Sequence, residues 1–247
     1  ALLVGSAWDT LLEGNVRHLI ERDCLPAYLG RQRWFAGRSR TIRSARIVDW
    51  AVTRRGREPA FLTIAEVTFA GDQRERYLLP LATESGTQAD RVLNETPETV
   101  LARLTGARKG VLYDACGGEK IGRELLALMS GGGTLPTRHG VITGQRTSAL
   151  DEVARGCDLE SLKASVVRRE QSNSSLVYGP ALILKLIRRL DAGPNPELEI
   201  GRHLTERRGF TRAPALAGAL SYQGPGDEPV TLGILHRLVE HQADGWG

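Results

Sequence analysis

Aromatic side chains are scarce in this chain of 247 residues, where they make up 5% of the sequence. Proteins that bind single-stranded nucleic acids stack bases on such side chains, so the scarcity argues against that class. The formal net charge of +4 is also too small to imply nucleic acid, although it suits anionic ligands such as nucleotides. We therefore expect no nucleic-acid partner.

Cysteine and long apolar runs are equally sparse. Cys24, Cys116 and Cys157 lie far apart and show neither pairing nor metal-binding spacing, which is typical of reduced thiols in a cytoplasmic protein. No segment approaches the roughly 18 consecutive apolar residues of a membrane helix. The apolar residues 1–6 lack the basic start and the length of a signal peptide. We expect a cytoplasmic protein with no metal site and no membrane span.

The first 90 residues combine one helix with three strands. Apolar residues recur at helical spacing over 8–29. Runs with strand character follow at 44–54, 60–69 and 75–82, separated by glycine-containing turns. A helix and an antiparallel meander form a small α+β unit. We call residues 1–90 the cap.

Residues 91–150 are the least clearly patterned part of the chain, and we interpret them as an intermediate linker region. The spacing predicts a short helix over 96–104, a strand over 109–115 and a helix over 119–129. Three glycines at 131–133 end the last of these helices.

Residues 151–247 show an order of elements different from that of the cap. Three strands, a helix and two further strands are predicted, with the strands at 165–171, 173–179, 181–189, 215–222 and 230–239. Asn195 is a suitable helix N-cap, Pro196 suits the first turn, and Glu197 and Glu199 lie near the positive end of the helix. The sequence thus predicts an α+β protein, a cap followed by an antiparallel lobe of five strands and one helix.

A single lysine stands out in the third strand of this lobe. Lys185 has apolar neighbours on both sides, and it should face a cleft or solvent because an unpaired buried ammonium group is costly. A lysine on the third strand, paired with a glutamate on the following helix, is how protein kinases hold the α- and β-phosphates of ATP. The polar turn 172–175 would cover those phosphates. Spacing alone leaves open which glutamate is the partner, although Glu197 shares a helix face with Ile200, Gly201 and Leu204.

Two long segments resemble maltokinases, in particular the maltokinase region fused to trehalose synthase in many bacteria. Residues 25–37 are similar to the N-terminal cap of that family and read LPAYLGRQRWFAG. Residues 170–204 resemble its phosphate loop, strand lysine and following helix, and read EQSNSSLVYGPALILKLIRRLDAGPNPELEIGRHL. The ending at 231–247, TLGILHRLVEHQADGWG, resembles its hinge.

The resemblance implies an N-lobe like that of aminoglycoside phosphotransferases, and transfer of the γ-phosphate of ATP to maltose, with Mg²⁺, to give maltose 1-phosphate. It favours Glu199 over Glu197 as the partner of Lys185, against the helical-face argument. The residues it implies for ATP binding are Ser172, Asn173, Ser174, Ser175, Lys185, Glu199 and the adenine hinge Arg237, Leu238 and Val239.

The same resemblance places the catalytic and metal-binding groups in a helical C-lobe after the hinge, and no such pattern occurs in this sequence. We therefore expect no catalytic residue in the chain, which would be the N-terminal, ATP-binding portion of a maltokinase and inactive alone. The alternative is a non-catalytic assembly module appended to a trehalose synthase domain. A C-lobe encoded after Gly247 would favour the kinase, and a stop codon would favour the module.

Overall fold

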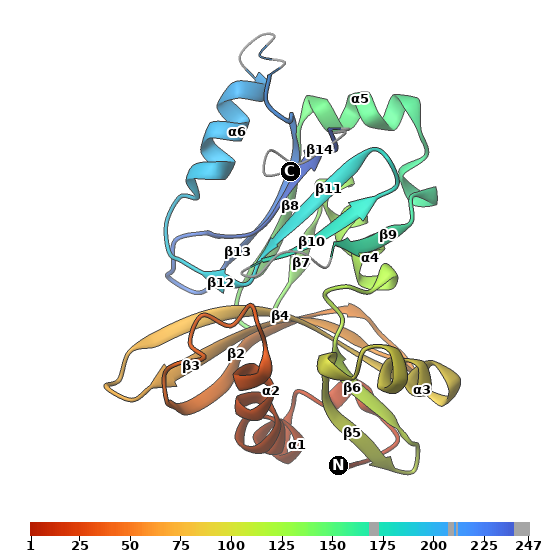
Figure 1. The fold of residues 1–247 in the computed structure, drawn as a ribbon, viewed down its shortest axis with the longest axis vertical. Helices are drawn as coiled ribbons and strands as arrows, with labels where there is room; N and C mark the ends of the chain where they lie inside the picture. The colour runs from red at the N-terminus through yellow and green to blue at the C-terminus, as the bar shows by residue number, and fades with distance from the viewer. Residues whose placement is uncertain (168–172, 207–209, 211, 240–247) are drawn as a thin grey trace, which may run out of the picture.

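The computed structural model describes residues 1–167, 173–206, 210 and 212–239, and within them the chain forms two seven-stranded sheets. The first has the order β1-β5-β6-β4-β3-β2, with β12 also paired to β4; the second has the order β7-β8-β13-β14-β11-β10-β9. In Figure 1 the first sheet crosses the middle of the molecule, and the second stands above it. We keep the name cap for the unit built on the first sheet and call the other unit the lobe.

The strands of the cap sheet are β1 (Leu2–Val4), β2 (Ile42–Arg54), β3 (Ala60–Phe69), β4 (Arg74–Ser85), β5 (Val100–Gly106), β6 (Gly110–Asp114) and β12 (Arg189–Leu190). Those of the lobe sheet are β7 (Thr134–Pro136), β8 (Val141–Arg146), β9 (Ala164–Val167), β10 (Asn173–Tyr178), β11 (Leu182–Ile187), β13 (Leu216–Gln223) and β14 (Val230–Arg237). The α-helices are α1 (Gly14–Leu19), α2 (Leu25–Arg31), α3 (Gly86–Glu95), α4 (Glu119–Ser130), α5 (Ser148–Gly156) and α6 (Pro196–Glu206). Short turns of other helix types are η1 (Trp8–Thr10), η2 (Ile20–Cys24), η3 (Pro97–Thr99) and η4 (Leu159–Ser161).

The cap sheet is covered on both faces. Phe61 and Val67 of β3 belong to an apolar cluster with residues of α2 and η2, on the face that Figure 1 shows downward. Leu62 and Ile64 alternate with them along β3 and join a second cluster, shared with the lobe. Because both faces are covered, β3 is buried along almost its whole length. The cap sheet is thus a middle layer, with the cap helices on one side and the lobe on the other.

Helix α4 fills the space between the lobe sheet and the cap. Its residues Ile121, Leu125 and Met129 lie in the same cluster as Leu184 of β11 and Leu235 of β14. Burying each such side chain stabilises the fold by about 1.5–3 kcal/mol. The lobe sheet therefore has one face committed to this core, and the alternate residues of its strands lie on the other face.

Backbone pairing joins the two units as well. Strand β12 follows β11 of the lobe, yet it pairs antiparallel with β4 of the cap, with Arg189 opposite Tyr77. The N–H of Leu78 also donates to the carbonyl oxygen of Arg188 at 2.8 Å. The cap sheet is thus completed by a strand that belongs to the lobe in sequence.

A buried carboxylate makes a second joint between the units. Asp49 of β2 is 1% exposed. It accepts hydrogen bonds from the Tyr222 hydroxyl at 2.8 Å, the Thr137 hydroxyl at 2.6 Å, and the backbone N–H groups of His139 and Trp50. A carboxylate with four donors is well satisfied although no cation pairs with it in the described part of the chain.

We expect Asp49→Ala to lower the free energy of unfolding of the chain by about 3 kcal/mol, because four buried donors lose their acceptor. Urea denaturation measures the change. Asp90→Ala is the matched control, since Asp90 is exposed on α3, and it should stay within about 0.5 kcal/mol of wild type. Equal losses in the two variants would contradict the role assigned to Asp49.

The α+β architecture predicted from the sequence is confirmed, and so are the three cap strands and the lobe order of three strands, a helix and two strands. The lobe sheet has seven strands where five were predicted, because β7 and β8 extend it next to β13. Residues 91–150 do not form a separate linker in the structure: β5 and β6 belong to the cap sheet and β7 and β8 to the lobe sheet.

Two local predictions were wrong. The segment 96–104 is a short turn followed by strand β5, which is held by β6 and by a parallel pair with β1. The single helix predicted over 8–29 is divided into η1, α1, the π-helical turn η2 and α2. Pro26 has no N–H to donate to the carbonyl four residues earlier, and the wide turn precedes it.

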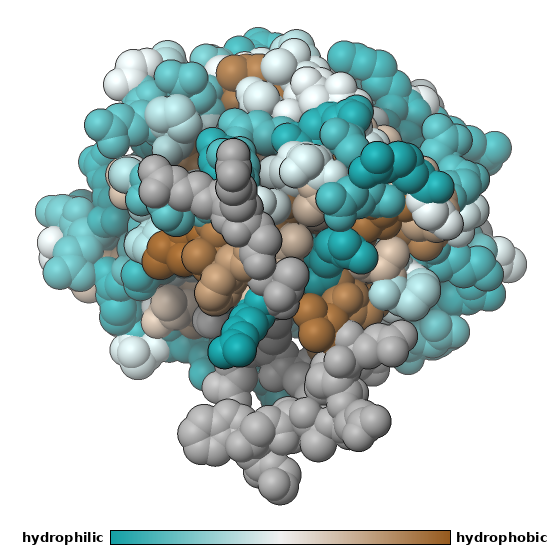
Figure 2. Space-filling model, turned by 90° about the horizontal axis from the view of Figure 1, so that it is seen from above, coloured by the Kyte–Doolittle hydropathy of each residue, from teal (hydrophilic) through white to brown (hydrophobic). Residues whose placement is uncertain are grey.

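The surface at the far end of the lobe, seen in Figure 2, is largely polar with separate apolar patches. Ile200 on α6 and Val239 after β14 are among the exposed large apolar residues of the described chain. Cys24, Cys116 and Cys157 are free thiols. None of the described helices has the length and hydropathy needed to cross a membrane.

Candidate functional site

Strand β11 alternates strictly between its two faces. Leu182, Leu184 and Leu186 are buried in the core, whereas the intervening residues, Lys185 among them, are half-buried on the opposite face. Lys185 lies directly opposite Ser175 of β10 and Ile234 of β14, so these three side chains share that face. The alternation explains why a lysine fits into an apolar strand.

Helix α6 brings a carboxylate to this lysine. The Nζ of Lys185 lies 2.5 Å from Oε2 of Glu197. The helix begins as the sequence predicted: Oδ1 of Asn195 accepts hydrogen bonds from the N–H groups of Glu197 at 2.9 Å and of Leu198 at 3.3 Å, and Pro196 is the first residue. The N-cap therefore fixes the turn that presents Glu197.

The expectation that Glu199 pairs with Lys185 was wrong: the structure gives the ion pair to Glu197. Two residues along a helix correspond to a rotation of about 200°, so both glutamates cannot face the same strand. The face of Glu197 is the one that docks, since a side chain at Gly201 would lie 3.6 Å from both His236 and Leu216. The helical-face argument was the better guide here.

His236 of β14 lies on the same face of the sheet as Lys185, in the adjacent strand. Burial lowers the pKa of His236, and the neighbouring Lys185 lowers it further, while Glu197 raises it. At neutral pH the imidazole is therefore neutral. His236 therefore adds no charge of its own beside the Lys185–Glu197 ion pair at neutral pH.

The predicted phosphate-covering residues 172–175 fall in different environments. Ser172 lies outside the described residues. Asn173, Ser174 and Ser175 form the first part of strand β10 rather than a turn. Ser175 is buried and opposite Lys185, whereas Ser174 is opposite Leu186 and points to the other face.

The predicted adenine hinge lies at the end of β14. The N–H of Arg237 donates to the carbonyl of Ala215 at 2.9 Å, and the N–H of Leu238 donates to the carbonyl of Ala181 at 2.8 Å. The guanidinium of Arg237 lies 3.3 Å from Glu152 of α5. Because the N–H groups of Arg237 and Leu238 already donate to other carbonyls, backbone recognition of adenine at these two residues would have to use their carbonyl oxygens. Val239 follows as an exposed residue.

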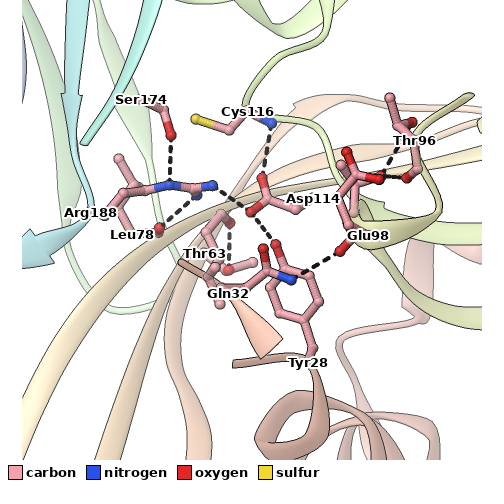
Figure 3. Close-up of polar contacts among 12 residues, drawn as sticks. Tyr28, Gln32, Thr63, Leu78, Thr96, Glu98, Asp114, Cys116, Ser174 and Arg188 are labelled. Carbon is pink, nitrogen blue, oxygen red and sulfur yellow. Dashed lines mark hydrogen bonds and ion pairs between the residues drawn. The ribbon is translucent and has the colours of Figure 1, made fainter. Parts of the chain in front are cut away.

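A polar cluster between the cap and the lobe was not predicted from the sequence. Arg188 and Asp114 are 3% and 4% exposed, and Nη2 of Arg188 lies 2.5 Å from Oδ2 of Asp114 (Figure 3). Both residues line a cavity of about 890 Å³, together with Asn173 and Ser174. The available signal was the pattern of β11, in which Arg188 continues the buried positions of Leu184 and Leu186.

The described residues contain no group of three or more His, Cys, Asp or Glu side chains arranged to hold a metal ion. The site on this part of the chain thus consists of a cationic group held by one carboxylate, on the face of the lobe sheet opposite the core. Such an arrangement can bind an anion, but the described residues offer no set of metal ligands.

The sequence of the cap matches a known family. Residues 28–117 match the family model described as the maltokinase N-terminal cap domain. This region therefore resembles maltokinase N-terminal cap domains. The match covers strands β2 to β6, and it ends at Gly117, just before α4. The matched region therefore corresponds to most of the cap unit described above.

Solved structures of a glucosamine kinase resemble the whole chain. One is described as glucosamine kinase in complex with glucosamine, ADP and inorganic phosphate; it superposes with a TM-score of 0.53 at 15% sequence identity, over 94% of this chain and 43% of that chain. Crystal form B of glucosamine kinase gives the same TM-score at 16% identity, over 94% of this chain and 42% of that chain. At this identity the likeness shows a kinase-like fold, and the chain spans less than half the length of the proteins it matches.

Proposed function

We propose that this chain is the ATP-binding N-terminal portion of a maltokinase, in which the complete protein transfers the γ-phosphate of ATP to maltose and forms ADP and maltose 1-phosphate. The observation that carries the proposal is the Lys185–Glu197 ion pair, placed on the third strand and the following helix of a kinase-like lobe. The maltokinase cap domain supports maltose as the acceptor. ADP in a glucosamine kinase structure supports a nucleotide as the donor.

The exposure of the Lys185–Glu197 pair supports a binding role. The two side chains are 33% and 42% exposed. Ion pairs this accessible to water contribute about 0–1 kcal/mol to stability, so a contribution to folding does not explain why this pair is present. In our proposal Glu197 orients the ammonium group, which donates to the α- and β-phosphates of ATP.

The other ATP contacts are proposed in the strand next to Lys185, in the residues just before it and at the hinge. Ser175 shares a face of the sheet with Lys185, and the adjoining residues Ser172, Asn173 and Ser174 complete the segment proposed to cover the phosphates. The hinge residues Arg237, Leu238 and Val239 would contact adenine through their backbone. Glu199 has no proposed contact with Lys185.

Mg²⁺ does not fit the described residues, since they contain no set of metal ligands. In our proposal the metal ligands, the catalytic base and the sugar site all lie in a helical lobe that follows the hinge. The chain itself contributes the orientation of the nucleotide. From the sequence resemblance we also propose that the chain belongs to a cytoplasmic protein that is fused to a trehalose synthase domain.

We expect the purified chain of 247 residues to form no maltose 1-phosphate from ATP and maltose, because we propose that the catalytic base and the metal ligands lie in the lobe that follows the hinge. A coupled assay of ADP release measures this. The full-length kinase is the positive control and should prefer maltose over glucose and glucosamine. Maltose 1-phosphate made by the chain alone would contradict the division of labour, and a preference for another sugar would contradict the acceptor.

A further inference from the structure

Arg188 is the side chain that passes from the lobe into the cap. It lies between β11 and β12 and is 3% exposed. Its guanidinium uses three different nitrogens: Nη2 contacts Asp114 at 2.5 Å, Nη1 donates to the carbonyl of Leu78 at 3.2 Å, and Nε donates to the hydroxyl of Ser174 at 3.1 Å. Figure 3 shows these contacts converging on the one group.

The cap holds this guanidinium firmly. Asp114 also accepts hydrogen bonds from the Tyr28 hydroxyl at 2.6 Å and from the N–H of Cys116 at 2.9 Å. The ring of Trp34 lies beneath the guanidinium, 4.3 Å from its central carbon. Burial alone would lower the pKa of Arg188, but the Asp114 carboxylate, together with Cys116 and Tyr28, raises it. The cation is therefore fixed in charge and in position.

The contact with Ser174 links this cluster to the proposed phosphate-binding strand. Ser174 and Ser175 are consecutive residues of β10 and face opposite sides of the sheet. Ser174 thus meets Arg188 on the cap side, while Ser175 faces Lys185 on the other side. Holding one of these residues restricts the other, since they share a peptide bond.

We propose that Arg188 is a positioning residue that fixes the first residues of β10 against the cap, and so sets the position of the strand opposite Lys185. The proposal rests on the proposed function for its consequence, which is the binding of ATP phosphates. It gives the maltokinase cap a defined task, because Asp114, Tyr28 and Trp34 hold the arginine.

The contacts require arginine rather than any cation. A lysine would keep the positive charge near Asp114, but its single ammonium group cannot reproduce the planar fork that reaches three acceptors. The backbone pairing of β12 with β4 does not depend on the side chain of Arg188. Arg188→Lys should therefore keep the cap docked and lose the hold on Ser174.

Amide hydrogen exchange of the whole chain tests the hold on β10. We expect amides of residues 173–178 to exchange about tenfold faster in Ser174→Ala and in Arg188→Lys, because one hydrogen bond to a charged donor is lost. Amides of β3 should be unchanged. Arg189→Lys is the matched control, since that neighbouring arginine is exposed and pairs with Asp191. Wild-type exchange in β10 of Ser174→Ala would overturn the proposal, even if Arg188→Lys fails to fold.

Kinetics of the full-length kinase separate this proposal from the proposed function. We expect Arg188→Lys to raise KM for ATP by about tenfold, with a much smaller change in kcat and no change in KM for maltose. Faster exchange in β10 with an unchanged KM for ATP would support the hold by Arg188 and contradict the phosphate site on β10. An increase in KM for maltose alone would contradict the positioning of a nucleotide-binding strand.

Discussion

Lys185→Ala in the full-length kinase is expected to lower kcat/KM for phosphoryl transfer by about 10³-fold, the loss typical of one charged group that stabilises a reacting phosphate. Steady-state kinetics with ATP and maltose measure the change. Folding should be unaffected, because the Lys185 side chain is one-third exposed and pairs with Glu197, which is exposed as well. Circular dichroism and the melting temperature should therefore match those of wild type.

Two further variants sharpen this test. Glu197→Gln should lower kcat/KM by a smaller factor of about 10, since the lysine remains but loses its orienting carboxylate, and Glu199→Gln should leave it within a factor of 2. Lys163→Ala is the control for loss of a lysine, because Lys163 is exposed on the lobe before β9. Wild-type rates in Lys185→Ala would refute the assignment, and a larger loss in Glu199→Gln than in Glu197→Gln would refute the pairing.

Asp114→Ala is expected to lower the free energy of unfolding of the chain by about 4 kcal/mol, because it leaves the buried guanidinium of Arg188 without its counter-charge. The Tyr28 hydroxyl and the N–H of Cys116 lose their acceptor in the same step. Urea denaturation followed by tryptophan fluorescence suits the measurement, since Trp34 lies under the guanidinium.

A double variant distinguishes a broken ion pair from a general packing defect. Asp114→Ala combined with Arg188→Met removes both charges, and it should be more stable than Asp114→Ala alone. Asp191→Ala breaks an exposed pair with Arg189 and should cost less than about 1 kcal/mol. The assignment fails if Asp114→Ala is no more harmful than Asp191→Ala, or if adding Arg188→Met makes it worse.

Much of the lobe could be predicted because its signals are local. The alternation of β11, the N-cap at Asn195 and the proline that follows it lie within a few residues of the features they specify. The helix face that carries Glu197, Ile200 and Gly201 was also visible; it favoured Glu197, which the structure pairs with Lys185, although spacing alone left the choice open. The error with Glu199 arose when position in a family pattern was preferred to that geometry.

What escaped prediction depends on contacts distant in sequence. Strand β5 has apolar residues at spacings that also suit a helix, and it becomes a strand because β6 and the N-terminal β1 pair with it. Arg188 and Asp114 are separated by 74 residues, and the sequence around either residue does not indicate that the other is its partner. Their partnership follows from how the cap sheet meets the lobe, which local patterns do not encode.

The pairing of β12 with β4 bears on where this protein can be divided. The family match ends at Gly117, but the seventh strand of the cap sheet comes from residues 189–190, and the upper faces of β3 and β4 share their core with α4. The boundary in sequence is thus not a boundary in the folded body. A cap of this kind keeps its whole sheet only together with the lobe strand that completes it.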